Sequence, residues 1–162
     1  MFIPSCYSLL ATINLFCYLF FSMELKRVVV TGLGAITPVG NNVLEMWNNI
    51  VNGVSGAAPI THFDTEKFKT KFACEVKGFN AADYIDPKEA RKMDLYSQYA
   101  VAAAKQAMED SKMDLTKVNL DRIGVIYGVG IGGLRTFEEE YGYYERTKEN
   151  GPKFNPFFIQ KM

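Results

Sequence analysis

Neither sign of charge is in excess in this sequence, because 18 lysines and arginines balance 18 aspartates and glutamates. Nucleic-acid-binding proteins usually have a basic excess, so nucleic-acid binding is not expected as the main function. Histidine occurs once, and the three cysteines follow neither a disulfide framework nor a zinc-binding pattern. We therefore expect no metal site. Only Cys74 lies beyond the first 22 residues, which is typical of a cytoplasmic protein.

The first 22 residues contain no charged side chain and are rich in Phe, Leu, Ile and Tyr. A signal peptide would begin with basic residues, whereas the first one here is Lys26. A membrane-spanning helix needs about 20 apolar residues, and the apolar stretch 7–21 is short for that and contains Asn14. We favour a third interpretation, in which translation starts at Met23 and 1–22 is upstream sequence. A membrane anchor or signal is the alternative.

The remaining residues, 23–162, have the pattern of an α/β protein. A β-branched run, Val28-Val29-Val30, ends at Gly32, which predicts a buried strand over residues 27–31. A second buried strand is expected over 123–127, and a short strand or edge hairpin over 72–76. The predicted helices cover residues 43–51, 86–93, 95–111 and 134–149. The aromatic segment 154–159 is expected to be buried, and so few strands indicate an incomplete domain.

Two glycine-rich turns follow the two predicted buried strands. Gly32-Leu33-Gly34 lacks the third glycine and the later acidic residue of a dinucleotide-binding fingerprint. The turn 128–133 is not a P-loop, because no Gly-Lys-Ser or Gly-Lys-Thr ends it. The first therefore indicates a tight strand-to-helix turn. For the second, close backbone packing and a position beside an apolar pocket remain equally open from the residues alone.

Neither Cys74 nor His62 is expected to be catalytic. Cys74 lies in a predicted strand beside Glu75, whose charge would raise the pKa of the thiol, so a buried structural cysteine is the better interpretation. The lone histidine, His62, lies in the predicted loop 54–71.

Three basic residues gather on the predicted helix 86–93. Asp86 and Pro87 are typical of a helix start, and Glu89 could complete a capping box. Lys88, Arg91 and Lys92 then fall at spacings of three and four, on one face. The ordinary interpretation of such a face is that it is solvated.

Four motifs, in this order and spacing, resemble the start of a known enzyme family. They are Lys-Arg-Val-Val-Val-Thr-Gly-Leu-Gly-Ala-Ile-Thr-Pro-Val-Gly at 26–40, Lys-Glu-Ala-Arg-Lys-Met-Asp at 88–94, Tyr-Gly-Val-Gly-Ile-Gly-Gly at 127–133 and Asn-Pro-Phe-Phe at 155–158. The chain resembles the N-terminal part of the elongating β-ketoacyl-acyl-carrier-protein synthases, of the synthase II type. The resemblance implies the thiolase-like fold, a layered α-β-α-β-α core formed by duplicated α/β halves, and a homodimer. This chain would hold part of the N-terminal half.

The resemblance also implies a reaction and a set of site residues. The family condenses an acyl chain, held on a cysteine, with a malonyl thioester that loses carbon dioxide, using no metal or redox cofactor. Substrates arrive on the phosphopantetheine arm of acyl carrier protein. Ile131 would border the acyl pocket, and Phe158 would help close the pocket of the neighbouring subunit. Lys88, Arg91, Lys92 and Lys153 would dock the carrier protein.

The catalytic groups of the family are expected beyond Met162: the nucleophilic cysteine, two histidines and a lysine. No catalytic residue is therefore assigned to this chain, which we expect to be inactive alone. Three alternatives stay open. The chain could be a non-catalytic fragment that binds carrier protein, part of a polyketide-type ketosynthase, or a membrane-tethered module if residues 1–22 are genuine.

Overall fold

The computed structural model describes residues 26–151 and 153–162, and the leader 1–22 lies outside them. The chain divides after Val30 into two units. Of the first unit, only the extended residues 26–30 are described, and Val28 is 90% exposed. Within the described ranges no helix is both long and apolar enough to cross a membrane.

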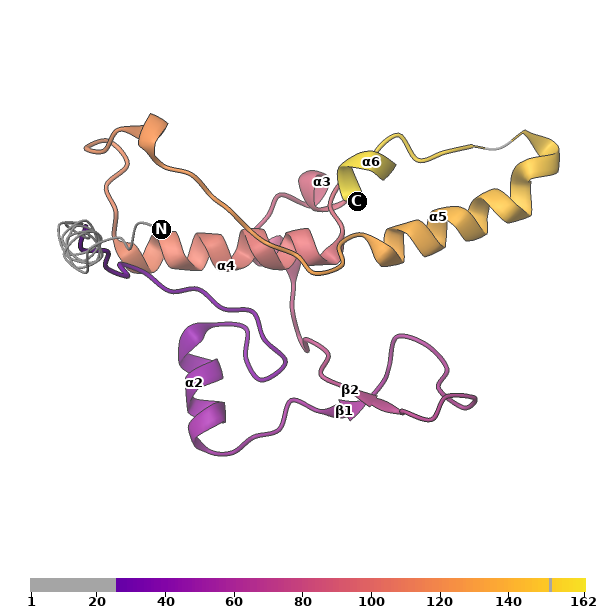
Figure 1. Cartoon of the computed structure of the whole chain (residues 1–162), viewed down its shortest axis with the longest axis horizontal. Helices are drawn as coiled ribbons and strands as arrows, with labels where there is room; N and C mark the ends of the chain where they lie inside the picture. Colours follow the sequence, from indigo (N-terminus) through magenta and orange to yellow (C-terminus); the bar gives the residue numbers. More distant parts are fainter. Residues whose placement is uncertain (1–25, 152) are drawn as a thin grey trace, which may run out of the picture. The chain divides into compact units, whose positions relative to one another are not determined.

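The second unit, residues 31–162, is mainly helical (Figure 1). Its helices are α2 (Val43–Val51), α3 (Pro87–Ala90), α4 (Leu95–Ser111), α5 (Leu134–Thr147) and α6 (Phe158–Lys161). Three 3-10 turns join them: η1 (Ala81–Asp83), η2 (Leu120–Arg122) and η3 (Lys148–Asn150). The strands are β1 (Ala58–Pro59) and β2 (Phe72–Ala73). The predictions for α2 and α4 are confirmed, and the predicted helix 134–149 corresponds to α5 with η3.

Side-chain caps explain where the first helices begin. The Asn42 side chain accepts a hydrogen bond from the Glu45 amide at 2.8 Å, and Asp86 accepts one from the Lys88 amide at 2.8 Å. Each cap satisfies an amide that has no partner within its helix. The prediction that Glu89 completes a capping box at α3 is wrong, because its carboxylate pairs with Lys92 instead. α3 is also shorter than predicted and ends at Ala90.

The glycine turn at 32–34 lies directly on α4. A β-carbon at Gly32 would come within 2.1 Å of the Ala107 carbonyl oxygen, and one at Gly34 within 1.9 Å of the Ala103 oxygen. Side chains add to this contact, because the Gln106 side chain accepts a hydrogen bond from the Ala35 amide at 3.1 Å. The tight strand-to-helix turn predicted here is therefore a turn in which backbone packs on backbone.

β1 and β2 pair antiparallel, with Ala58 opposite Ala73 and Pro59 opposite Phe72. The predicted edge hairpin is thus confirmed, although its first strand falls in a stretch predicted to be loop. The second strand is shorter than the predicted 72–76. It ends at Ala73, so Cys74 lies outside it and is exposed rather than buried. The interpretation of Cys74 as a buried structural thiol is wrong for this structure.

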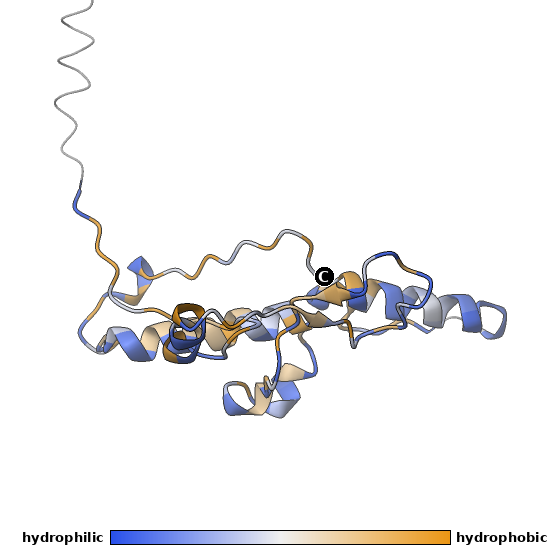
Figure 2. Cartoon of the chain, turned by 90° about the horizontal axis from the view of Figure 1, so that it is seen from below, coloured by the Kyte–Doolittle hydropathy of each residue, from blue (hydrophilic) through white to orange (hydrophobic). Residues whose placement is uncertain are grey.

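The two strands predicted to be buried, at 27–31 and 123–127, are extended but unpaired within the described residues. Val125 is 75% exposed and Ile126 is 99% exposed, and much of the extended chain carries the hydrophobic colour in Figure 2. A strand exists only when a neighbour accepts and donates its backbone hydrogen bonds. The two buried strands predicted here are therefore wrong for the described residues, because neither segment pairs into a sheet and their apolar side chains remain exposed.

The aromatic segment near the end of the chain is only partly covered. The Phe154 ring stacks on Tyr144 at 5.7 Å between ring centres, and Phe158 lies 6.4 Å from Phe137. Phe154 is nevertheless 67% exposed and Ile159 is 81% exposed. The predicted burial of 154–159 is wrong here, because the contacts with α5 leave most of this segment exposed.

Candidate functional site

The residues predicted to dock a carrier protein lie on α3 and the turn after it. Lys88 is within α3, Arg91 is its C-cap, and Lys92 follows. Lys88 and Arg91 are exposed, and within residues 26–151 and 153–162 neither belongs to an ion pair. Lys92 differs, because its Nζ lies 2.6 Å from Glu89 Oε1 and 5.9 Å from the centre of the Phe157 ring. Two of the three cations are thus available to a partner, and the third is engaged within the chain.

The end of this basic segment is fastened to α4 by one amide. Gln98 Nε2 donates hydrogen bonds to the carbonyl oxygens of Ala90, at 3.0 Å, and Met93, at 3.2 Å. These carbonyls end the turn that presents Arg91. Sequence reasoning missed Gln98, because a glutamine at a helix start shows no preference for a particular distant carbonyl.

Lys153, the fourth predicted docking residue, lies in the chain between η3 and α6 and is exposed. It precedes the aromatic Phe154 and comes four residues before Phe157, whose ring lies beneath Lys92. No interaction of the described residues joins Lys153 directly to Lys88, Arg91 or Lys92.

The turn predicted to border an acyl pocket comes just before α5. Ile131 is 77% exposed, so the described residues do not enclose it. The following residues are tightly placed. A β-carbon at Gly132 would lie 2.9 Å from the Tyr96 ring, and Gly133 has a φ of +65°. A positive φ favours glycine. The structure thus gives a reason for glycine at 132 and 133, and it leaves the Ile131 side chain available to an apolar ligand or neighbour.

Phe158, predicted to close the pocket of a neighbouring subunit, starts α6 and is half-buried. Its ring faces Phe137 of α5 at 6.4 Å with a tilt of 36°. Phe137 stacks in turn on Tyr141 at 6.3 Å. Phe158 therefore belongs to an aromatic row with Phe137 and Tyr141 of α5.

Asp94 and Thr136 join the two predicted parts of the site, and sequence reasoning missed both. The Thr136 hydroxyl donates a hydrogen bond to the Asp94 carboxylate across 42 residues of sequence. Thr136 is 6% exposed and is the one buried polar side chain among the described residues. In a sequence, an aspartate just before a helix is expected to cap that helix. Asp94 does not cap α4 with its side chain, so its hydrogen bond to Thr136 could not be predicted from its position.

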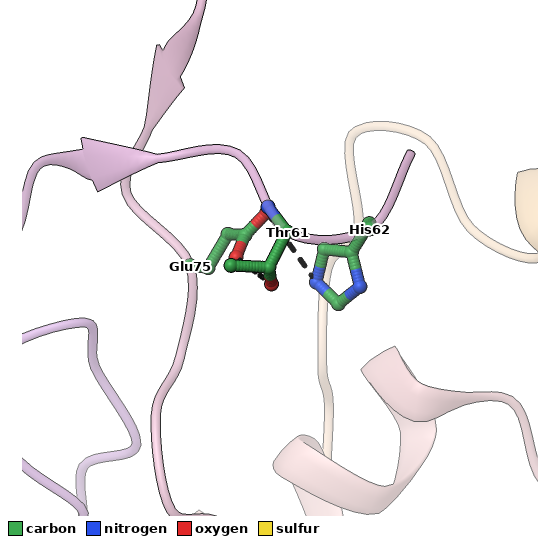
Figure 3. Close-up of polar contacts among 3 residues, drawn as sticks. All are labelled: Thr61, His62 and Glu75. Atoms are coloured by element: carbon green, nitrogen blue, oxygen red, sulfur yellow. Dashed lines mark hydrogen bonds and ion pairs between the residues drawn. The ribbon is translucent and has the colours of Figure 1, made fainter. Parts of the chain in front are cut away.

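His62 belongs to a small polar cluster on the hairpin loop (Figure 3). Its Nε2 lies 3.8 Å from Glu75 Oε1, while Glu75 accepts hydrogen bonds from the Thr61 hydroxyl at 2.7 Å and the Thr61 amide at 3.0 Å. The Thr61 hydroxyl, followed by its amide, lowers the pKa of Glu75, and the nearby His62 lowers it further. The cluster ties the two ends of the loop together through the Thr61–Glu75 hydrogen bonds.

The part of the chain that the structure describes has no group of three His, Cys, Asp or Glu side chains able to hold a metal ion. Cys74, the free thiol of that part, is exposed on the chain just after β2.

Comparison with known proteins identifies the family to which this chain belongs. Residues 25–162 match the family model of the β-ketoacyl synthase N-terminal domain. The 3-oxoacyl-[acyl-carrier-protein] synthase 2 of Staphylococcus aureus (strain COL) is 46% identical over 138 residues, which are 85% of this chain and 33% of that protein. The chain thus spans about a third of the length of the curated relatives it matches.

Two solved structures share the fold. The ishigamide ketosynthase/chain length factor superposes with a TM-score of 0.66 at 30% identity, over 82% of this chain and 33% of that one. A type II PKS ketosynthase, solved in complex with its acyl-carrier protein (AntDE:AntF), has a TM-score of 0.66 at 27% identity, over 85% of this chain and 35% of that one. The expected thiolase-like α/β fold class is confirmed, and the chain belongs to the β-ketoacyl synthase family, whose N-terminal domain it matches.

Proposed function

We propose that the whole protein carrying this chain is a 3-oxoacyl-[acyl-carrier-protein] synthase of fatty-acid biosynthesis, an acyltransferase. It would condense malonyl-carrier protein with an acyl group held on the enzyme, releasing carbon dioxide. The observation that carries this proposal is the 46% identity, over 85% of the chain, to a protein of that name. We place the protein in the cytoplasm and expect it to work as a homodimer, with no metal or redox cofactor in the condensation.

We assign this chain two tasks in that reaction, docking the carrier and bordering the acyl pocket. Lys88 and Arg91 present charge to solvent without an internal partner among the described residues, which suits an acidic carrier protein. Lys92 and Lys153 would add to the docking surface, Lys92 more weakly because Glu89 already neutralises it. Ile131 and Phe158 would line the acyl pocket. The nucleophile, two histidines and a lysine would come from the remainder of the protein.

Charge reversal tests the docking role. The double variant Lys88→Glu/Arg91→Glu in the whole protein should bind acyl carrier protein at least tenfold more weakly at low salt. Two exposed ion pairs contribute about 0.2–1 kcal/mol each, and reversal adds repulsion. The matched control is Lys67→Glu/Lys69→Glu, which makes the same charge change on the exposed hairpin loop. Equal losses in both variants, measured by calorimetry or surface plasmon resonance, would refute docking at α3.

A side-chain enlargement tests the pocket role. Ile131→Phe should shorten the longest acyl chain that the enzyme extends, because a larger side chain fills part of an apolar pocket. The control is Ile50→Phe, which makes the same enlargement at an exposed isoleucine of α2, outside the acyl-pocket turn. Product analysis by mass spectrometry gives the readout. An unchanged chain-length limit in Ile131→Phe would remove this residue from the pocket.

A polyketide-type ketosynthase is the second candidate. One of the two solved structures described above is a ketosynthase/chain length factor, and the other is a type II PKS ketosynthase. The lower identities, 30% and 27% against 46%, favour the fatty-acid enzyme. Successive unreduced condensations by the purified protein with malonyl-carrier protein would instead support the polyketide function. A non-catalytic carrier-binding protein would bind the carrier and form no product.

A further inference from the structure

The Asp94–Thr136 hydrogen bond joins two segments that the proposed function uses for different purposes. Asp94 follows the basic segment of α3 by one residue, Met93, and it is the N-cap of α4. Thr136 lies in the first turn of α5, three residues after Gly133 of the acyl-pocket turn. No other polar side chain of the described residues is buried as deeply as Thr136.

Asp94 makes this bond and does not make the usual helix-cap bond. An aspartate at an N-cap normally accepts a hydrogen bond from an amide in the first turn of its own helix. Asp94 makes no such bond, and its carboxylate accepts from the Thr136 hydroxyl instead. Because a buried hydroxyl needs a partner, the two segments are held at one separation.

Contacts on either side of the pair reinforce the same junction. Two residues before Asp94, Lys92 lies over the Phe157 ring at 5.9 Å. Two residues after it, the Tyr96 ring occupies the space that a side chain at position 132 would need. Arg135, next to Thr136, is also within reach of the Asp94 charge: its pKa is raised by its hydrogen bond to Glu139 and, to a smaller extent, by Asp94.

We propose that Asp94 and Thr136 are a positioning pair, which sets the carrier-docking segment at a fixed distance from the acyl-pocket turn. The inference rests on the proposed function. The pair touches neither the carrier nor the acyl chain. The pair would act by fixing a distance. A carrier docked at α3 would then present its thioester arm to an acyl-pocket turn that lies at a constant distance from the docking site. A displacement of about 1 Å at such a junction can cost up to about a hundredfold in rate.

The test compares two acyl donors in the whole enzyme. One is acyl-carrier protein, which uses the docking segment, and the other is acyl-pantetheine, which has the same thioester without the carrier. Thr136→Val keeps the shape of the side chain but removes the hydroxyl, and Thr136→Ser keeps the hydroxyl. We expect Thr136→Val to lower kcat/KM about tenfold more for the acyl-carrier protein than for acyl-pantetheine. Thr136→Ser should restore the wild-type ratio, and the Kd of the carrier should stay unchanged in both variants.

A mutant cycle separates a pair from two independent residues. Asp94→Leu keeps a side chain of similar size and removes both carboxylate oxygens, so that no acceptor remains for the Thr136 hydroxyl. It also serves if Thr136→Val fails to fold. Thr136→Val/Asp94→Leu should be no worse than the more damaging single variant, because either change already breaks the junction. Additive losses in the double variant would overturn the proposal.

The remaining outcomes are distinct. Equal losses for both donors in Thr136→Val, or no loss for either, would overturn the proposal while leaving the proposed function intact. A wild-type enzyme that condenses neither donor would instead overturn the proposed function itself.

Discussion

Two glycine turns of similar sequence have different surroundings in this molecule. Gly32 and Gly34 lie so close to α4 that a β-carbon on either would fall within 2.1 Å of a helix carbonyl oxygen. Gly128 and Gly130 have nothing within 4 Å of the corresponding position. The first turn needs glycine because backbone meets backbone. In the second turn, Gly132 and Gly133 are constrained by the Tyr96 ring and by a positive φ, whereas Gly128 and Gly130 have no such need among the described residues. In our proposal these two glycines serve the acyl pocket.

The largest expected difference between the two turns is in the free energy of unfolding after a glycine is replaced by alanine. Gly34→Ala should lower the free energy of unfolding by roughly 1–3 kcal/mol, because the Ala103 oxygen is backbone and cannot move aside cheaply. Gly130→Ala should be neutral or stabilise by up to about 1 kcal/mol, since it lacks both a clash and a left-handed φ. Urea denaturation of the two variants checks this. A comparable loss for Gly130→Ala in the whole protein would show that its remaining residues pack on the second turn.

The first turn should also depend on the side chain of Gln106. This amide accepts from the Ala35 amide at 3.1 Å and donates to the Asn41 carbonyl at 2.7 Å and the Tyr84 hydroxyl at 3.0 Å. Gln106→Leu should cost about 1–3 kcal/mol, because partly buried backbone groups lose their partners. Hydrogen exchange should then quicken at Ala35, which distinguishes a local opening from a general loss of stability.

The control for that variant is Gln160→Leu, at an exposed glutamine of α6. It should change stability by less than about 0.5 kcal/mol. If both glutamine variants cost the same, the anchoring of the first turn through Gln106 would be contradicted.

A smaller difference is expected at the helices that follow the two turns. Asn42 caps α2 through its side chain, whereas Gly133, at the N-cap of α5, has no side chain to do so. Asn42→Ala should cost about 1 kcal/mol. Asn48→Ala, an exposed site within the same helix, should be slightly stabilising because alanine has the higher helix propensity. Thermal unfolding that ranks the two variants in the reverse order would argue against the cap.

The smallest expected effect concerns the pKa of Glu75, whose side chain holds the hairpin loop through Thr61. Glu75 has a pKa below its ordinary value, chiefly because the Thr61 hydroxyl donates to its carboxylate. A lowered folded-state pKa means that this stabilisation is complete above the ordinary glutamate pKa and is lost as the pH falls through the lower, folded value. Thr61→Val should raise the Glu75 pKa toward the ordinary value in an NMR titration. Thr70→Val, in the same loop, should leave it unchanged.

Local signals in the sequence predicted α2, α4 and α5, because the alanine-rich run favours α4 over Leu95–Ser111 and Asp86 with Pro87 marks the start of α3. The early end of α3 at Ala90 and the short helix α6 (Phe158–Lys161) were not predicted. The buried strands were a different matter, because apolar residues such as Ile126 specify extended chain, whereas pairing depends on distant neighbours. The expected burial of Cys74 was wrong for a related reason, since the length of β2 is set by its partner β1.

In the candidate site, too, the sequence located individual residues but not their interactions. Lys88 and Arg91 are exposed, as the motif around Arg91 led us to expect, but α3 ends at Ala90, before Arg91 and Lys92, so the single basic helix face predicted over 86–93 does not form. The sequence could not show that Lys92 is already neutralised by Glu89, because that spacing also suits solvated side chains. Nor could it pair Asp94 with Thr136, since no periodic pattern relates residues in two separate helices.

The contact of the first glycine turn with α4 has a practical consequence for anyone mapping this protein by mutation. An alanine scan works by deleting side-chain atoms, and here there are none to delete. The helix contributes Ala103 and Ala107, which such a scan leaves as they are, and the turn contributes Gly32 and Gly34. One of the closest contacts in the molecule would therefore leave no mark on the helix side of the map, and only substitutions that add atoms can reveal it.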